Sequence, residues 1–223
     1  MSLTRRSFFF LLALTALISA AFAIGGGGGD SGGGSTPSFD ESNLKCDEKP
    51  TIAERIDCRI DLPLNYEKLN YLPEECRNMT GSARFDCLST YESLQECWGI
   101  PDGVNREICA KTQIGLGSIS AEKAACSTTS CLQSLRNRVY KLVKFRFYNL
   151  EQRAVNLIKF GISRQDAVDL LVSLETQKVN FNNAGNIDGK KQVVLDAKKD
   201  WENFKLKAVP QMKKFFEEKG EWK

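Results

Sequence analysis

The chain has 223 residues, of which 31 are Lys or Arg and 28 are Asp or Glu, so its formal net charge is only +3. It contains eight cysteines and no histidine. The absence of histidine excludes Ser-His-Asp and Cys-His catalytic arrangements, and also zinc sites that need imidazole ligands.

Residues 1–23 are predicted to be a signal peptide. Arg5 and Arg6 form a short basic start, residues 8–20 are almost purely apolar, and a small-x-small cleavage pattern ends at Ala23. The alternative is an uncleaved segment that anchors the protein, and the export route, secretory or twin-arginine, stays open. We therefore expect an exported protein, located outside the cell, at the cell surface or in a periplasm-like space.

Residues 24–44 are rich in glycine and serine and have little apolar surface to bury, which predicts a flexible tether. The chain then divides by charge. Residues 24–131 contain 17 acidic and 10 basic residues, a net charge of −7, whereas residues 132–223 contain 11 and 19, a net charge of +8. All the cysteines lie in the first part. We expect an acidic cysteine-rich helical unit over residues 45–131 and a basic helical unit over residues 132–223 that folds on its own.

Short helices are predicted in the cysteine-rich unit. The first begins at a capping box formed by Thr51 and Glu54 and ends before Pro63. A second runs from about residue 80 to residue 97, and a third covers residues 104–111. A unit of this size has little core of its own, so disulfides are the expected reinforcement.

Three segments repeat one pattern, in which an arginine stands three residues before the closing cysteine. They are Cys46-Arg55-Cys58, Cys76-Arg84-Cys87 and Cys97-Arg106-Cys109. An even cysteine count after an export signal indicates disulfides, although eight cysteines allow 105 pairings. We predict the pair within each repeat, with Cys126–Cys131 as the fourth; a framework that links neighbouring helices fits the same spacing.

The arginine of each repeat is expected to pack its aliphatic stem beside the disulfide and to expose its guanidinium group. A row of anion-binding arginines is the alternative.

The basic unit is predicted to be a three-helix bundle, or a helical hairpin, with coiled-coil-like packing. Its first helix ends near Gly161 and the next begins at Ser163. A turn-rich break over residues 182–189 precedes the last helix, which Pro210 must kink or interrupt. The residues expected on the apolar faces are Val139, Val143, Phe147, Leu150, Ala154 and Leu157, then Ala167, Leu170, Leu171 and Leu174, then Val194, Ala197, Trp201, Phe204 and Ala208. The expected fold class is therefore all-α.

A basic surface is predicted on the last helix, where Lys191, Lys198 and Lys205 recur every seven residues away from the apolar face. Such a surface can bind lipid headgroups, acidic polysaccharide or nucleic acid, the last without sequence specificity. A simple solvated face is the alternative. Basic residues of the first helix of this unit are expected to add to it: Arg136, Arg138, Lys141, Lys144 and Arg146.

Few motifs indicate chemistry. Ser120 and Lys123 match the S-x-x-K pattern of serine hydrolases activated by lysine, but Ser120 is equally suited to cap a helix. Asn78 begins an N-glycosylation sequon. The cysteines do not form paired CxxC knuckles, so we expect no metal site and no cofactor.

The order of the segments TIAERIDCRIDLP, EEC, RFDC, ECW and REIC, followed by a basic helical tail, resembles uncharacterised exported cysteine-rich helical proteins of small-genome archaea. The resemblance implies location and architecture, and no activity. We therefore expect a binding or structural component of the cell surface, without catalysis, whose partner is another protein or an anionic envelope component. Peripheral contact with a membrane is part of that expectation. A cell-envelope hydrolase that uses Ser120 and Lys123 is the alternative function.

Overall fold

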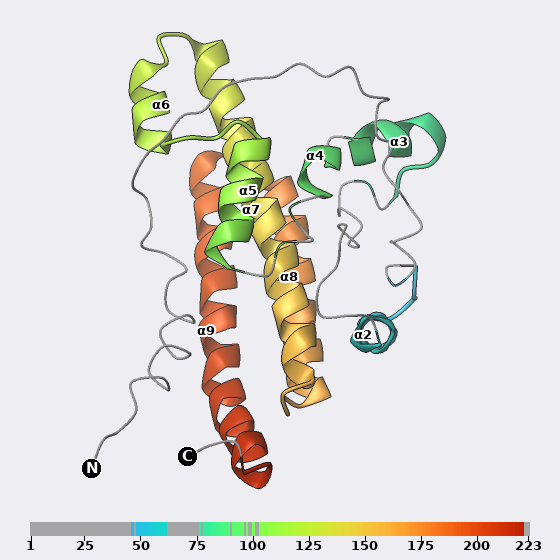
Figure 1. Ribbon diagram of the computed structural model, residues 1–223. Coiled ribbons are helices and arrows are strands. Elements are labelled where there is room, and N and C mark those ends of the chain that lie inside the picture. Colours follow the sequence, from blue (N-terminus) through green and yellow to red (C-terminus); the bar gives the residue numbers. More distant parts are fainter. Residues whose placement is uncertain are drawn as a thin grey trace, which may run out of the picture.

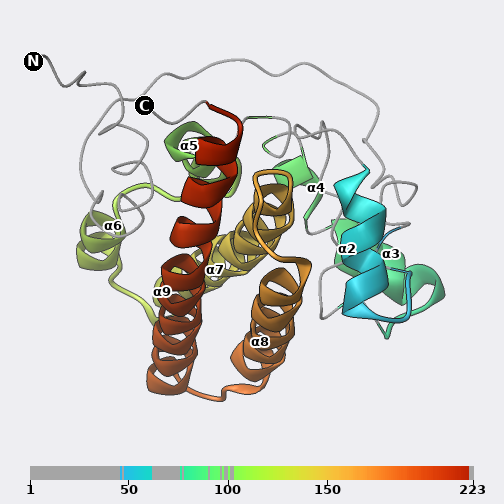
Figure 2. The same cartoon turned by 90° about the horizontal axis from the view of Figure 1, so that it is seen from below.

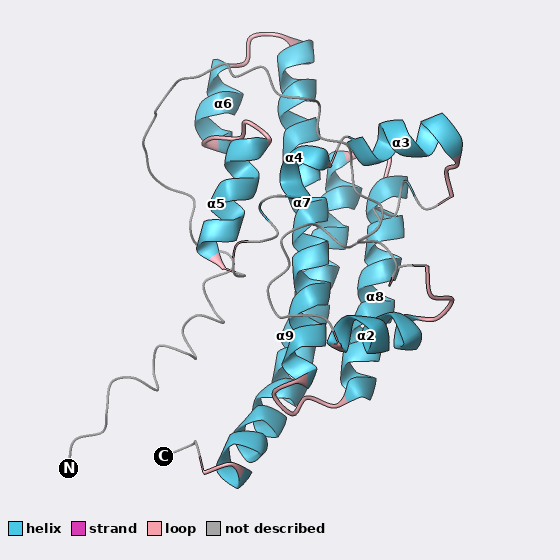
Figure 3. Cartoon of the chain, turned by 45° about the vertical axis from the view of Figure 1, so that its right-hand side comes forward, coloured by secondary structure: helices cyan, strands magenta, loops and turns pink. Residues whose placement is uncertain are grey.

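The computed structural model describes Cys46, residues 48–61, Cys76, residues 78–89 and 91–95, Cys97, Ile100 and residues 103–220. Within these residues every regular element is an α-helix and no strand is present (Figure 3). The expected all-α fold class is confirmed. The predicted signal peptide and tether lie outside the described residues.

Three long helices form the body of the protein: α7 (Thr129–Ile158), α8 (Arg164–Asn183) and α9 (Ile187–Glu218). They run side by side in Figure 1, and in the view from below α7 lies behind the pair α8 and α9 (Figure 2). Each begins at a side chain that accepts a backbone amide, from Thr128, Ser163 and Asn186 respectively. The basic part is therefore a three-helix bundle and not a hairpin.

The turn between α7 and α8 depends on Gly161. This residue has a φ of +90°, and a Cβ placed on it would lie 2.5 Å from the Cβ of Phe215 in α9. The α9 residue Gln211 accepts from the Ser163 amide at 2.6 Å and donates to Asp166 at 2.8 Å. The close approach and the positive φ both require glycine, so the end of α9 holds the start of α8.

The last helix differs from the expectation in two places. The break before it is only residues 184–186, because the Asn186 side chain caps α9 and takes the following residues into the helix. Val193, and not Val194, is buried on its inner face. Pro210 lies inside α9 and does not end it, and the C-terminal end of the helix changes direction in Figure 3, which agrees with the predicted kink. Proline removes one backbone hydrogen bond of the helix, which favours such a bend.

The short helices of the cysteine-rich part are α2 (Ile52–Ile60), α3 (Gly81–Ser89), α4 (Glu92–Gln95), α5 (Val104–Gln113) and α6 (Ile119–Ala125). Helix α2 packs on α7 and α8, whereas α5 and α6 pack on α7 (Figure 1). The capping box of Thr51 and Glu54 is confirmed. The single helix expected over residues 80–97 is wrong: the chain breaks between α3 and α4, which lets Leu88, Tyr91 and Leu94 all face the interior.

The described cysteines are all paired, with Cα atoms 5.4–5.7 Å apart, and none is free. The pairs are the local ones that the repeat predicts: Cys46–Cys58, Cys76–Cys87, Cys97–Cys109 and Cys126–Cys131. Such bonds persist in an oxidising environment, so they indicate a protein that resides outside the cytosol.

The buried side chains form two clusters, and both cross the boundary expected after Cys131. One joins Leu88, Leu94 and Ala110 to Leu142 and Phe145 of α7. The other joins Ile56 of α2 to the facing sides of α7, α8 and α9, which include these residues: Phe147, Leu171, Leu174, Trp201 and Phe204. The cysteine-rich part and the bundle therefore share their hydrophobic cores.

Candidate anion-binding surface

The three cysteine repeats contain the same tight turn. The amide three residues after the opening cysteine donates to the carbonyl of that cysteine, at 3.3, 3.1 and 3.2 Å for Cys46, Cys76 and Cys97. Arg55 and Arg106 then donate from Nε to the carbonyl of that same third residue, at 3.1 and 2.7 Å. In the first and third repeats, the arginine therefore connects its helix to the turn that the disulfide closes. This contact explains why the arginine recurs at the same position of these two repeats.

The other end of each of these guanidinium groups reaches the bundle. Arg55 Nη1 lies 3.1 Å from Glu175 Oε1 on α8. Arg106 Nη1 donates to Asn149 Oδ1 at 2.9 Å and to Gln152 Oε1 at 2.5 Å on α7, and the Arg106 residue is 1% exposed. A row of exposed anion-binding arginines is therefore wrong, and so is the expectation that each head stays in water.

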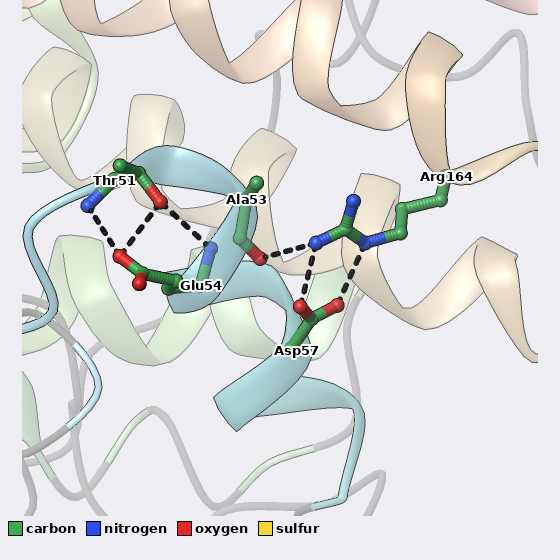
Figure 4. Close-up of polar contacts among 5 residues, drawn as sticks. All are labelled: Thr51, Ala53, Glu54, Asp57 and Arg164. Carbon is green, nitrogen blue, oxygen red and sulfur yellow. Dashed lines mark hydrogen bonds and ion pairs between the residues drawn. The ribbon is translucent and has the colours of Figure 1, made fainter.

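Ion pairs connect the two oppositely charged parts of the chain. Arg164 at the start of α8 holds Asp57 of α2 through two contacts of 2.5 and 2.7 Å and donates to the Ala53 carbonyl at 3.2 Å (Figure 4). The hydrogen bonds from Arg164 lower the pKa of Asp57 below its ordinary value. Both side chains are about half exposed, so the contact orients α2 more than it stabilises the fold.

Two further pairs use basic residues of α7. Arg146 lies 2.5 Å from Glu107, and Arg138 lies 2.6 Å from Glu122. Burial opposes ionisation of Glu107, but Lys111 and Arg146 outweigh it and lower the pKa of this carboxyl. Much of the charge division seen in the sequence therefore serves contacts within the chain, and Arg138 is not a free cation.

A buried charge pair, which sequence reasoning missed, lies where α2, α7 and α8 meet. Lys178 Nζ is 2.8 Å from Glu151 Oε1 and 3.2 Å from Glu175 Oε1, and the side chains of Lys178 and Glu151 are only 4% and 1% exposed. Arg59 of α2 is also buried and acts on the charge of Glu151. In the sequence, this pair could be suspected only because single charged residues interrupt apolar faces of helices. Helical periodicity does not show which of these residues contact each other in the fold.

The pH dependence of stability should reveal Glu151. Burial raises its pKa to about 6, aided by the charge of Glu175 and opposed by Lys178 and Arg59. Between pH ~4.5 and ~6 the folded protein therefore binds more protons than the unfolded chain, so this group destabilises the fold as pH rises through that window. Urea unfolding gives the free energy of unfolding of the wild type and of Glu151→Gln at each pH. The value for the wild type minus that for the variant should be higher at pH 4.5 than at pH 7, by on the order of 1–2 kcal/mol.

Carboxylates that do not interact with Glu151 are common to the two proteins and cancel in this difference. Asp57, Asp166 and Glu107 have lowered pKa values and destabilise both proteins alike as the pH falls. A difference that stays constant from pH 4.5 to 7 would contradict the raised pKa of Glu151.

The basic surface predicted from Lys191, Lys198 and Lys205 on α9 is only partly present. Lys191 and Lys198 are exposed, but the side chain of Lys205 is 14% exposed and lies 2.6 Å from Glu202. Lys191 also has an acidic neighbour, with its Nζ 3.1 Å from Asp188. The three lysines therefore do not form one uniform cationic surface.

A different group of lysines lies where α7 meets the start of α9. Lys141 and Lys144 share one side of α7, and Lys190 Nζ lies over the rings of Tyr140 and Phe181, 5.1 and 4.6 Å from their centroids. Burial, and then the charge of Lys144, lowers the pKa of both Lys141 and Lys190. We call these three residues the lysine cluster; a bound anion would relieve their mutual repulsion. Sequence reasoning named the two lysines of α7 but had no signal that brings Lys190 to them.

An open depression on α7 adjoins the lysine cluster through Lys141. Six residues at helical spacing line it: Ser130, Gln133, Ser134, Asn137, Arg138 and Lys141. None of these six is acidic or apolar, and four are neutral groups that donate and accept hydrogen bonds. We call it the α7 depression. Its polar stripe can be read in the sequence, as S-x-x-Q-S-x-x-N-R-x-x-K, and all six lining residues belong to α7. Helix α6 meets the stripe at Arg138, through Glu122.

Ser120 and Lys123 are both exposed on the short helix α6. Ser118, and not Ser120, caps this helix, and the Ser120 hydroxyl lies 3.1 Å from the Ser118 hydroxyl.

The remaining features can be placed briefly. Asn78 is exposed in the turn before α3, so its sequon is accessible. The described residues contain no group of three or more potential metal ligands. None of the described helices has the length and apolar character needed to cross a bilayer.

The sequence matches no protein-family model, and neither the curated proteins nor the solved structures contain a significant match.

Proposed function

We propose that this protein is an exported, disulfide-stabilised binding or structural component of the cell surface or envelope, and that it does not catalyse a reaction. The four disulfides support a location outside the cytosol, and the predicted signal peptide supports export. A shared core, in which the cysteine repeats are tied to the bundle through Arg55 and Arg106, suits a rigid carrier of a binding surface.

The proposed partner is an anionic component of the envelope. The observation that carries this proposal is the α7 depression beside the lysine cluster, where hydrogen-bond donors and like charges gather without a lining carboxylate. Arg138 is already paired with Glu122, so Lys141 supplies the charge inside the depression. Peripheral contact with a membrane is included in the proposal, because lipid headgroups are one source of anionic groups at the envelope.

Binding should be measured for the exported protein against an acidic polysaccharide and against vesicles with anionic lipid. The double variant Lys141→Gln, Lys144→Gln should weaken binding by roughly thirtyfold, since each lysine near a charged surface contributes about 1 kcal/mol. Binding should also weaken as salt is added, because the interaction depends on screened charges.

The matched control is Lys191→Gln, Lys198→Gln, which makes the same change in net charge on α9. We expect it to change affinity by less than about threefold, since Lys191 already has Asp188 as a neighbour. Equal losses in the two variants would show that binding follows net charge and not this surface. No binding of either ligand at low salt would overturn the proposed function.

A further inference from the structure

The shape of the α7 depression restricts what it can bind, and this inference rests on the proposed function. Its lining residues stand at positions i, i+3, i+4, i+7, i+8 and i+11 of one helix. At 1.5 Å per residue, the stripe from Ser130 to Lys141 extends about 16 Å. A ligand that contacts the whole stripe is therefore an extended chain and not a single compact ion.

The groups along the stripe are not uniform. Ser130, Gln133, Ser134 and Asn137 provide hydroxyls and amides in the first part, and the cationic Lys141, a member of the lysine cluster, lies at the far end. Gln133 Nε2 donates to Asn137 Oδ1 at 3.1 Å, which fixes the two amides relative to each other. Each amide keeps further hydrogen-bonding capacity, with an acceptor oxygen on Gln133 and donor hydrogens on Asn137, one helical turn apart.

A stripe of hydroxyl and amide side chains that donate and accept matches sugar hydroxyl groups, which do both as well. A cation at one end matches a carboxylate or sulfate. We infer that the α7 depression binds a segment of an acidic polysaccharide, with sugar hydroxyls along Gln133 and Asn137 and an acidic group at Lys141.

A lipid surface fits the depression less well. Binding to a bilayer interface combines basic residues with apolar side chains that enter the headgroup region. The six lining residues include no apolar side chain. The exposed large apolar residues of α9 belong to another helix; they are Ile187, Val194, Leu195, Leu206 and Val209. The chemistry of the depression itself therefore favours carbohydrate.

The test uses the exported protein and titrates it with uronic-acid oligosaccharides, with neutral oligosaccharides of equal length, and with vesicles that contain anionic lipid. The uncharged double variant Gln133→Ala, Asn137→Ala should weaken binding of the acidic oligosaccharide by about tenfold, as expected for the loss of one or two hydrogen bonds. Its salt dependence should stay unchanged, because no charge is removed. Alanine favours helix, so the fold should be retained, which circular dichroism verifies.

Gln192→Ala is the matched control, because Gln192 makes a similar amide contact on α9, to Asp196 at 2.9 Å. It should leave affinity unchanged. Wild-type binding to vesicles without binding to the acidic oligosaccharide would overturn the carbohydrate assignment and leave the proposed anion-binding function standing. The same conclusion follows if Gln133→Ala, Asn137→Ala binds the oligosaccharide as wild type does. Failure of the wild type to bind either ligand would instead overturn the proposed function.

Discussion

Arg106→Ala should lower the free energy of unfolding by about 3 kcal/mol or more, one of the largest losses expected for a single residue of this protein. The residue is 1% exposed, and its guanidinium donates to the Ile100 carbonyl, to Asn149 and to Gln152. Truncation leaves three acceptors without this donor and opens a cavity between α5 and α7. Each unsatisfied buried acceptor costs about 1–3 kcal/mol. Urea unfolding without reductant measures the loss.

The matched control is Arg84→Ala, because Arg84 occupies the same position before the closing cysteine of the second repeat and is only partly buried. We expect a loss of about 1 kcal/mol there. Arg106→Lys should fall between the two, since an ammonium group cannot reproduce the planar fork of a guanidinium. Equal losses for the two alanine variants would contradict the anchoring role of Arg106.

Trp201→Ala should cost about 3–5 kcal/mol, as large-to-small changes of buried aromatic residues do. Trp201 is 3% exposed on the inner face of α9, and its ring lies 5.4 Å from that of Phe204. The variant loses apolar contact with α7 and α8 and leaves a cavity that these helices can only partly fill. Thermal unfolding followed by circular dichroism measures the effect.

The variant Trp201→Phe distinguishes the contribution of the aromatic ring from that of the indole N–H group. The indole Nε1 is buried and has no hydrogen-bond acceptor among the described residues, so phenylalanine removes an unsatisfied donor while it keeps an aromatic ring. We expect a loss below about 1.5 kcal/mol. Leu206→Ala, on the outer face of α9 and 76% exposed, should change stability by less than about 0.5 kcal/mol. A loss for Leu206→Ala as large as that for Trp201→Ala would mean that the inner face is wrongly assigned.

Local signals predicted the elements that depend on neighbouring residues. The side-chain caps at Thr51 and Ser163 lie within three residues of the amides that they accept, so the sequence contains the whole interaction. Gly161 is readable as a helix end from its position alone, but its close approach to Phe215 of α9 is not. The same holds for the disulfides, whose closing cysteines are 5–12 residues from their opening ones. Where two local signals compete, as for Ser118 and Ser120 or for Val193 and Val194, the pattern alone chose the wrong residue.

Only part of the candidate site could be predicted, because some of its residues are close in the chain and others are brought together by the fold. Lys141 and Lys144 stand out on α7 as a charged pair three residues apart. Lys190 joins them only because α8 reverses the chain and brings the start of α9 back to the middle of α7. The lysines that recur every seven residues on α9 made a clear pattern, but periodicity shows which side of a helix a residue occupies and not which acidic neighbour lies beside it, as Glu202 lies beside Lys205.

The helical class and most of the amphipathic faces follow from the sequence alone, because they depend on residues close in the chain. The sequence also favoured the local disulfides, but the structure was needed to choose them over a framework between neighbouring helices. Only the tertiary structure decided the roles of the charged residues. Arg106 and Glu151 look like ordinary surface residues in a helical pattern, yet packing against α7 and α8 buries them, and burial requires partners from distant segments. Charge acts through space, so its function is set by which helices the fold places side by side.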